Sequence, residues 1–447
     1  MKKDLLPLNS VANVRFLSPA YALLSSVFLF FAILIILPVS VKIPLTGTAM
    51  LFWFVCFFSF LGGTLFGAGN QYCIPSNSND ANQISNIKQK KSNVRLLIFI
   101  VAIGFIGSIL LLIDRYGLRE VSFTADAMAS REVLAESSSS IISMVAAFAS
   151  SIGVLSYMLI WLVELNKISV RLWVKFIAIL NILTVILVSV QLGSRSLLLV
   201  ILLSHMLVWF FVSRVSGNKL KKLHMFIVFI LLSCMTVLSA LLIIMRVNLM
   251  GFSMLDSILI SSYAEIIEPS EFVLDLLQNE NILTVLIAGI FSLVQYVFHG
   301  IYEFSLLFND FDGDHEMGYR TFWLPLKAFS TLTNGSISVG EFSNSGIREG
   351  IFTTYVGPVF IDFGLFSPLI LFVNGILFGL PFRWLVQGKL AWLPLVALFS
   401  TGAILWPVVN IFESSSGTFL LVGSIVIGLF GKSFRLNAIY LNNVSKQ

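Results

Sequence analysis

The chain has 447 residues, of which 57% are hydrophobic and only 11% are charged, and its mean hydropathy is +0.94. Soluble domains carry about 25% charged residues, so this composition excludes a water-soluble globular protein. The net charge of +5 is modest, and we attribute it to lysine and arginine held on the cytoplasmic side of a membrane rather than to nucleic-acid binding.

Repeated apolar runs predict transmembrane helices, because about 20 residues are needed to cross the hydrocarbon core as a helix. We therefore expect an all-α, polytopic integral membrane protein with about 10 to 12 transmembrane helices. The run that starts near Tyr21 is long for a signal-peptide core and no cleavage pattern of small residues follows it, so we expect it to remain as a span. In chain order, the expected spans are residues 20–39, 49–66, 96–113, 141–163, 172–191, 196–213, 225–245, 365–386, 391–411 and 417–431.

The basic residues are divided unevenly between the connections. Nineteen of the 28 fall in one alternating set of connections and nine in the other, where seven of the nine are arginine. Because basic residues favour the cytoplasmic side, both termini are expected in the cytoplasm. Arginine presents a rigid fork that matches phosphate oxygens, so the excess of arginine in the outer connections favours an anion-binding role. The alternative is chance or structural ion pairing, as between Arg115 and Asp114.

Three sections are expected along the chain: a bundle of about seven spans over residues 1–245, a large periplasmic loop over 246–364 and about three further spans over 365–447. Within the loop, residues 253–267 read as an amphipathic interfacial helix that ends at Pro269. The apolar stretch 282–298 is expected to be re-entrant or interfacial, although a full crossing with a second helix is an alternative. Residues 309–316 and 333–346 read as loops.

Two arginines are the first candidates for an anion site. Gly193 can close one helix and Ser194 can cap the next, which leaves Arg195 in the first turn beside free backbone N–H groups. Arg246 ends the next outgoing span and should emerge at the same depth. The two guanidinium groups could hold a diphosphate whose lipid tail runs down between helices. The structural alternatives are a snorkelling arginine in a helical turn and an interfacial anchor.

Other candidates lie in the long loop. Arg320 and Arg348 could complete the clamp on the diphosphate, with ion pairing as the alternative. His299 could act as a general base or bond a sugar hydroxyl, although a lone histidine is more often structural. Alternatives for activating an acceptor are Tyr263, Glu265 and Glu268.

No cofactor or metal is expected. No Walker loop or GxGxxG sequence is present, no pair of acids has metal-ligand spacing, and the acidic run Asp310–Asp314 reads as a solvated loop. The three cysteines, Cys56, Cys73 and Cys234, form no disulfide or zinc pattern. His205 lies within a span, where packing is its expected role.

Gly193-Ser194-Arg195 between paired spans, Arg246 at the next outer exit, a large outer loop and then the segment 353–364 (TTYVGPVFIDFG) resemble the O-antigen polymerases, a family of oligosaccharide repeat-unit polymerases. The resemblance implies a glycosyltransferase in a bacterial inner (cytoplasmic) membrane, which acts at the periplasmic face on sugars carried by undecaprenyl diphosphate. It would move the growing glycan from its lipid diphosphate onto a new lipid-linked repeat unit without a nucleotide sugar. Arg195 and Arg246, with Arg348 as a third, would hold the diphosphate. Partners would be membrane lipid and a chain-length regulator protein.

Three other functions are compatible with the same sequence. A flippase or transporter of lipid-linked oligosaccharide would need polar groups buried within the spans, and the expected spans contain almost no charges. An O-antigen ligase would move finished glycan onto a lipid core. A membrane scaffold would need no chemistry.

Overall fold

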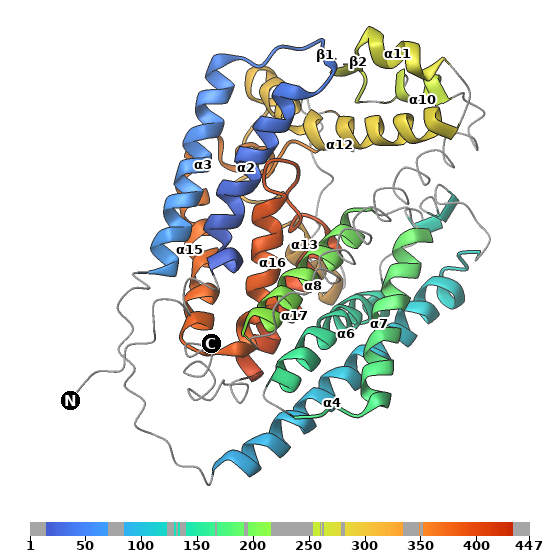
Figure 1. The fold of residues 1–447 in the computed structure, drawn as a ribbon, viewed down its shortest axis with the longest axis vertical. Helices are drawn as coiled ribbons and strands as arrows, with labels where there is room; N and C mark the ends of the chain where they lie inside the picture. The colour runs from blue at the N-terminus through green and yellow to red at the C-terminus, as the bar shows by residue number, and fades with distance from the viewer. Residues whose placement is uncertain are drawn as a thin grey trace.

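The structure is a computed structural model that describes residues 15–69, 85–122, 129–130, 133–134, 140–165, 168–191, 195–215, 254–259, 261, 263–278, 282–333, 348 and 352–431. It is all-α apart from one small pair of strands, as the sequence predicts (Figure 1).

The amino-terminal part of the chain is built from long helices with one short strand. In order these are η1 (Arg15–Leu17), α2 (Pro19–Ile36), β1 (Val39–Val41), α3 (Gly47–Ala68), α4 (Ser85–Leu112), the π-helical η2 (Ile113–Leu118), α6 (Ile141–Leu165), α7 (Leu172–Gln191) and α8 (Arg195–Val215).

The remaining elements begin with short ones and end in a group of apolar helices. They are α10 (Met254–Leu259), β2 (Ile267–Pro269), α11 (Glu271–Leu277), α12 (Ile282–Asp310), α13 (Trp323–Leu332), α14 (Val356–Phe363), η3 (Gly364–Phe366), α15 (Ser367–Val386), η4 (Leu390–Trp392), α16 (Leu393–Ile404) and α17 (Ser415–Phe430).

Eight helices within the described residues are long and apolar enough to cross a membrane, which makes the chain a multi-pass membrane protein. Six of the expected spans correspond to α2, α3, α4, α6, α7 and α8, and the expected span 365–386 corresponds to α15. The expected spans at 391–411 and 417–431 are the shorter apolar helices α16 and α17. The expected span 225–245 lies outside the described residues.

Helices of the first and third predicted sections pack together through glycine. On α3, Gly63 and Gly67 are one turn apart, and on α15 Gly375 and Gly379 have the same spacing. A Cβ atom on Gly67 would lie 2.2 Å from the carbonyl oxygen of Ile376, so only glycine permits this approach of the two backbones. Small residues four apart are a common means of helix association in lipid, where apolar burial gives no net drive.

Two more contacts join distant parts of the chain. α4 packs closely along α6, where Gly104 and Gly153 face each other. α16 packs against both α2 and α8, and the hydroxyl of Ser400 donates to the carbonyl of Leu17 at 2.7 Å. The carboxyl-terminal helices therefore stand among the amino-terminal ones.

The strands β1 and β2 were not predicted. They pair antiparallel, with Ser40 opposite Glu268, and so fasten the long loop to the connection between α2 and α3. The amphipathic helix expected over 253–267 is wrong in its extent, because α10 ends at Leu259 and the chain then turns into β2 to make this pairing. The short helix α11 begins at Glu271, directly after Pro269 and Ser270.

α12 lies across the ends of α2 and α3 rather than alongside them (Figure 1). The α3 cap residue Thr46 contacts Ser305 and Asn309 of α12, and the Phe30 and Phe298 rings are 4.7 Å apart. Length and composition alone make α12 a candidate span. The expectation of a re-entrant or interfacial segment at 282–298 therefore stays a prediction. The helix extends to Asp310 and so takes in the first residues of the expected acidic loop.

Candidate active site on α12

One face of α12 carries a row of buried polar side chains. Gln295, His299 and Glu303 follow one another at intervals of four residues, which places them on the same side of a helix. Their exposed fractions are 1%, 0% and 4%. Because buried polar groups are costly without partners, this face must meet a complementary surface.

Gln295 connects α12 to the turn that carries two of the predicted residues. Its Nε2 donates to the carbonyl of Ile267 at 2.9 Å and to that of Ile258 at 3.3 Å. These bonds hold the chain between α10 and β2 against α12 and so position Tyr263 and Glu265 over the helix.

His299 is held in a defined orientation. Its Nδ1 lies 2.9 Å from the Gln295 carbonyl oxygen, which can only accept, so Nδ1 carries the proton. In the neutral ring the lone pair is then on Nε2, which is buried and has no hydrogen-bond partner among the described residues. The Tyr263 ring covers the imidazole at a centroid distance of 4.4 Å, and Tyr296 flanks it at 6.1 Å.

Arg348 joins the same cluster from the far end of the long loop. Its Nη1 donates to Glu303 Oε1 at 2.8 Å, and its Nη2 lies 3.0 Å from Glu265 Oε2. The Glu265 side chain is 69% exposed whereas that of Glu303 is 4% exposed, so the arginine bridges a buried carboxylate and a solvated one. We call Tyr263, Glu265, Tyr296, His299, Glu303 and Arg348 the α12 site.

The α12 site combines an oriented imidazole with ionisable neighbours. A neutral imidazole whose Nδ1–H is held by a carbonyl can accept a proton at Nε2, which is what a general base does. Arg348 can bond anionic oxygens, but only after releasing Glu265, since one guanidinium already serves two carboxylates. His299, Tyr263, Glu265 and Arg348 were separate candidates in the sequence, and the structure brings all four together. Glu303 and Tyr296, which complete the site, were not predicted from the sequence.

Arg320 belongs to a different cluster. Its Nε lies 3.7 Å from Glu413 Oε1, and its backbone N–H donates to Asp362 at 3.0 Å. Thr321 donates to the same carboxylate through both its N–H and its hydroxyl. The pKa of Glu413 is raised to about 7, chiefly because its carboxyl is removed from water, while the Arg320 charge acts in the opposite direction. These contacts fix the start of α13 against α14 and the loop before α17.

The other residues predicted for the site lie elsewhere or outside the described part of the chain. Arg195 is the first residue of α8, as expected, and the structure describes its backbone but not its side chain. Ser194 and Arg246 lie outside the described residues, so their predicted roles stay predictions. Glu268 pairs with Lys42 across the two strands, which gives it a structural role. His205 bonds the Ile201 carbonyl and packs beside Trp161, as expected.

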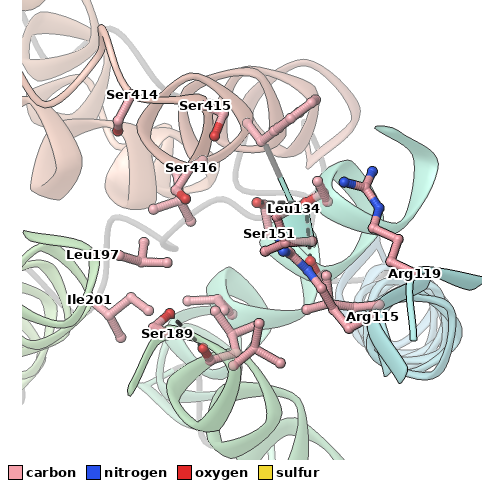
Figure 2. Close-up of a pocket in the computed structure, with 18 residues that line it drawn as sticks. Arg115, Arg119, Leu134, Ser151, Ser189, Leu197, Ile201, Ser414, Ser415 and Ser416 are labelled. Carbon is pink, nitrogen blue, oxygen red and sulfur yellow. Dashed lines mark hydrogen bonds between the residues drawn. The ribbon is translucent and has the colours of Figure 1, made fainter. Parts of the chain in front are cut away.

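A cavity of about 460 Å³ forms a second polar region (Figure 2). Its walls include Arg115, Arg119 and the three serines that open α17, Ser414 to Ser416. We call it the arginine–serine cavity. An ion pair between Arg115 and Asp114 was one alternative to an anion-binding role, but the structure pairs Asp114 with Arg119 at 3.3 Å. The reason is the π-helical turn η2, which brings residues five apart into register.

The α12 site and the arginine–serine cavity lie at the same end of the helix bundle. The cavity is lined from the C-terminal ends of α4 and α7 and the N-terminal ends of α6, α8 and α17. The α12 site lies beyond the C-terminal end of α2 and the N-terminal end of α3. Because successive spans run in opposite directions, these ends belong to one membrane face.

No group of three or more His, Cys, Asp or Glu side chains that could hold a metal occurs within the part of the chain that the structure describes. Comparison with models of protein families, with curated proteins and with solved structures gave no match. Function is therefore inferred from the chain's own residues.

Proposed function

We propose that this protein is a polymerase of lipid-linked oligosaccharide repeat units, of the kind that builds O-antigen or a similar surface polysaccharide. It transfers the growing glycan from undecaprenyl diphosphate to a new lipid-linked repeat unit. The reaction takes place at the periplasmic face of a bacterial inner membrane, with both termini in the cytoplasm. The observation that carries the proposal is the convergence of His299, Tyr263, Glu265 and Arg348 at one end of a membrane bundle.

The α12 site supports the acceptor half of this reaction. A sugar hydroxyl of the new repeat unit attacks the anomeric carbon of the growing glycan, a new C–O bond forms and the proton passes to His299 Nε2. The Tyr263 ring lies against the imidazole in the present conformation, so we expect the acceptor sugar to displace the phenol ring and stack in its place. General-base assistance of this kind contributes about 10²–10⁴-fold to a rate.

The donor half of the reaction requires stabilisation of a leaving group. The C–O bond to the lipid diphosphate breaks, and the electron pair stays on the diphosphate oxygen. Preorganised cations are suited to that developing charge, so neither covalent catalysis nor a nucleotide is needed. Arg195 at the start of α8, Arg246 and Arg348 are the proposed ligands of the diphosphate, as in the resemblance to O-antigen polymerases.

Deletion of the gene tests the proposal against its rivals. Loss of a polymerase should leave a surface glycan of one repeat unit. Loss of a flippase should leave none, and loss of a ligase should leave long polymer on its lipid carrier. Complementation with Arg195→Ala or Arg246→Ala should reproduce the single-unit pattern with normal protein in the membrane. Long chains from both variants would exclude the diphosphate clamp.

Sidedness is tested by labelling single cysteines in a background without the three native ones. A thiol reagent that cannot cross the membrane should label Glu265→Cys and Lys42→Cys from the periplasm, because both side chains are about half exposed or more. Arg171→Cys, which is exposed at the opposite end of the bundle before α7, should be labelled only after the membrane is opened. The reverse pattern would invert the orientation and remove the proposal.

A further inference from the structure

The arginine–serine cavity is built from α4, α6, α7, α8, α17 and the η2 turn, and it contains a positive charge without a full set of partners. Asp114 is 1% exposed and pairs with Arg119, so these two charges offset each other. Arg115 adds a second guanidinium from the same turn, and its buried Nε has no hydrogen-bond partner among the described residues. A buried donor of this kind is costly to leave unbonded, which points to a bound acceptor.

The opposite wall supplies more donors. Figure 2 shows Arg115 reaching from η2 toward the interior of the cavity, with Ser416 on α17 facing it across the space. Ser414 caps α17 by accepting from the Gly417 N–H at 3.1 Å. The other first-turn N–H groups of a helix have no intrahelical partners, and the helix end carries partial positive charge.

No acidic side chain lines the cavity within the described part of the chain. The nearest acid along α17 is Glu413, immediately before the cap residue, and its carboxylate pairs with Arg320 outside the cavity. The guanidinium of Arg115 and the helix end therefore act together on whatever enters. This combination favours an anion with several acceptor oxygens.

The rest of the wall is apolar. Val154, Val185, Leu197, Ile201 and Phe419 come from helices that are membrane spans or lie among them. A volume of about 460 Å³ is within the range of about 300–1,000 Å³ that is usual for ligand pockets, and it exceeds what a lone inorganic anion would fill. A polar head beside an apolar wall is the chemistry of a lipid.

We propose that the arginine–serine cavity binds the phosphate or diphosphate headgroup of a membrane lipid, with Arg115 and the N-terminus of α17 as its ligands and the start of the lipid tail along the apolar wall. The site shares no residue with the α12 site. The inference goes beyond the proposed polymerase function and does not depend on it, because occupancy is measured directly and not through glycan synthesis.

Native mass spectrometry of the purified full-length protein tests this inference. The probes are undecaprenyl diphosphate, phosphatidylglycerol, undecaprenol (a similar tail without phosphate) and inorganic pyrophosphate. We expect undecaprenyl diphosphate or phosphatidylglycerol, or both, to bind about tenfold more tightly than undecaprenol and pyrophosphate. Arg115→Gln should reduce that affinity about tenfold, the usual effect of losing a charged hydrogen bond. The exposed Arg171→Gln, at the opposite end of the bundle, is the matched control and should bind normally.

Ser416→Asp separates a binding defect from a folding defect. An acid in the first turn of a helix favours the helix but repels a bound phosphate, so thermal unfolding should be unchanged or shifted upward while lipid affinity falls. Unchanged lipid binding in both Arg115→Gln and Ser416→Asp would overturn the inference. If undecaprenol bound as tightly as the phosphate-bearing lipids, the cavity would be an apolar pocket and the inference would be wrong. If pyrophosphate bound as tightly as those lipids, the cavity would be a site for free anions and not for a lipid headgroup.

Discussion

The α12 site and the arginine–serine cavity lie at the same face of the bundle and carry opposite charge. In the α12 site one arginine stands between two glutamates, and its partners lie 2.8 and 3.0 Å away. Two arginines line the cavity, and the one buried aspartate nearby, which is not part of the lining, pairs with Arg119 only. The first region is a closed network around an imidazole, and the second has a cation without a full set of partners.

This difference separates two tasks that a lipid-linked glycosyl transfer requires. Removing a proton from a sugar hydroxyl calls for an oriented base, and a network that is already satisfied gives that orientation. Holding a phosphate calls for donors that are not yet used, because a guanidinium already paired must first give up its partner. The predictions below test whether each region behaves as its charge balance indicates.

The largest effect is expected at the imidazole of the α12 site. His299→Ala should lower the rate of glycan polymerisation about 10²–10⁴-fold while the protein stays in the membrane, because the proposed general base is lost. Polymer length on gels and turnover of lipid-linked repeat units by membranes are the measurements.

His205→Ala provides a matched control for this variant. That histidine is also helical and also bonds a carbonyl four residues earlier, at 2.8 Å, but it packs against Trp161 within the bundle. Polymerisation should be within a few-fold of normal. Equal losses from His205→Ala and His299→Ala would show that only helix packing is affected and would end the general-base assignment.

A smaller effect is expected from opening the ion pair of Arg348. Glu303→Leu removes the buried carboxylate partner of the Arg348 guanidinium and keeps the solvated Glu265, so the free energy of unfolding should fall by about 1–3 kcal/mol. Glu265→Leu removes an exposed partner and should cost less than about 1 kcal/mol. Denaturant unfolding in detergent measures both. Equal losses would mean that the two carboxylates are equivalent and that the network is not closed on its buried side.

Much of the fold was predictable because apolar length carries the signal for a membrane helix. The boundaries of α7 match the expected span, residues 172–191, and those of α6 and α8 are within two residues. The helix pair α3 and α15 was not anticipated, although Gly63 with Gly67 and Gly375 with Gly379 show the spacing that permits it. The strands escaped prediction because each is three residues long, too short for an alternating pattern.

The candidate site was only partly predictable, for a physical reason. His299 and the residues near Tyr263 were found by their chemistry and their place beside an apolar run. Their meeting depends on Gln295, whose side chain bonds two backbone carbonyls, and no sequence pattern reports that. Arg115 adjoins Asp114 in the sequence, so an ion pair between them was a natural alternative, but the π-helical turn gives Asp114 to Arg119.

A further test concerns the attachment of the turn to α12. In Gln295→Leu the new side chain is similar in shape but cannot donate to the carbonyls of Ile258 and Ile267. The free energy of unfolding should therefore fall by about 1 kcal/mol for each lost hydrogen bond. Polymerisation should fall more than stability alone explains, because Tyr263 and Glu265 lose their fixed position. Gln278→Leu, at the exposed end of α11, is the control. Unaltered activity with lowered stability would show that the turn does not need to be held.

The smallest effect is expected outside both regions, at the ion pair between Arg320 and Glu413. Because the folded-state pKa of Glu413 is raised to about 7 from 4.5, the proton binds more tightly to the folded protein than to the unfolded one. The resulting stability is fully present below about pH 4.5 and is lost as the pH rises through about 7. Wild-type Tm should therefore fall relative to that of Glu413→Gln between pH 5 and pH 8, since the amide does not titrate.

Arg320 influences the pH at which this stability is lost, because its charge acts on the pKa of Glu413. Its charge favours the ionised carboxylate and so works against the effect of removal from water, with Asp362 acting in the same direction as that removal. Arg320→Gln should raise the pKa of Glu413 further and move the loss of stability to higher pH. Parallel Tm curves for the wild type and Glu413→Gln across this range would mean that Arg320 fully neutralises the carboxylate. The segment before α17 would then present no titrating charge beside the arginine–serine cavity, and lipid binding there should be independent of pH over the same interval.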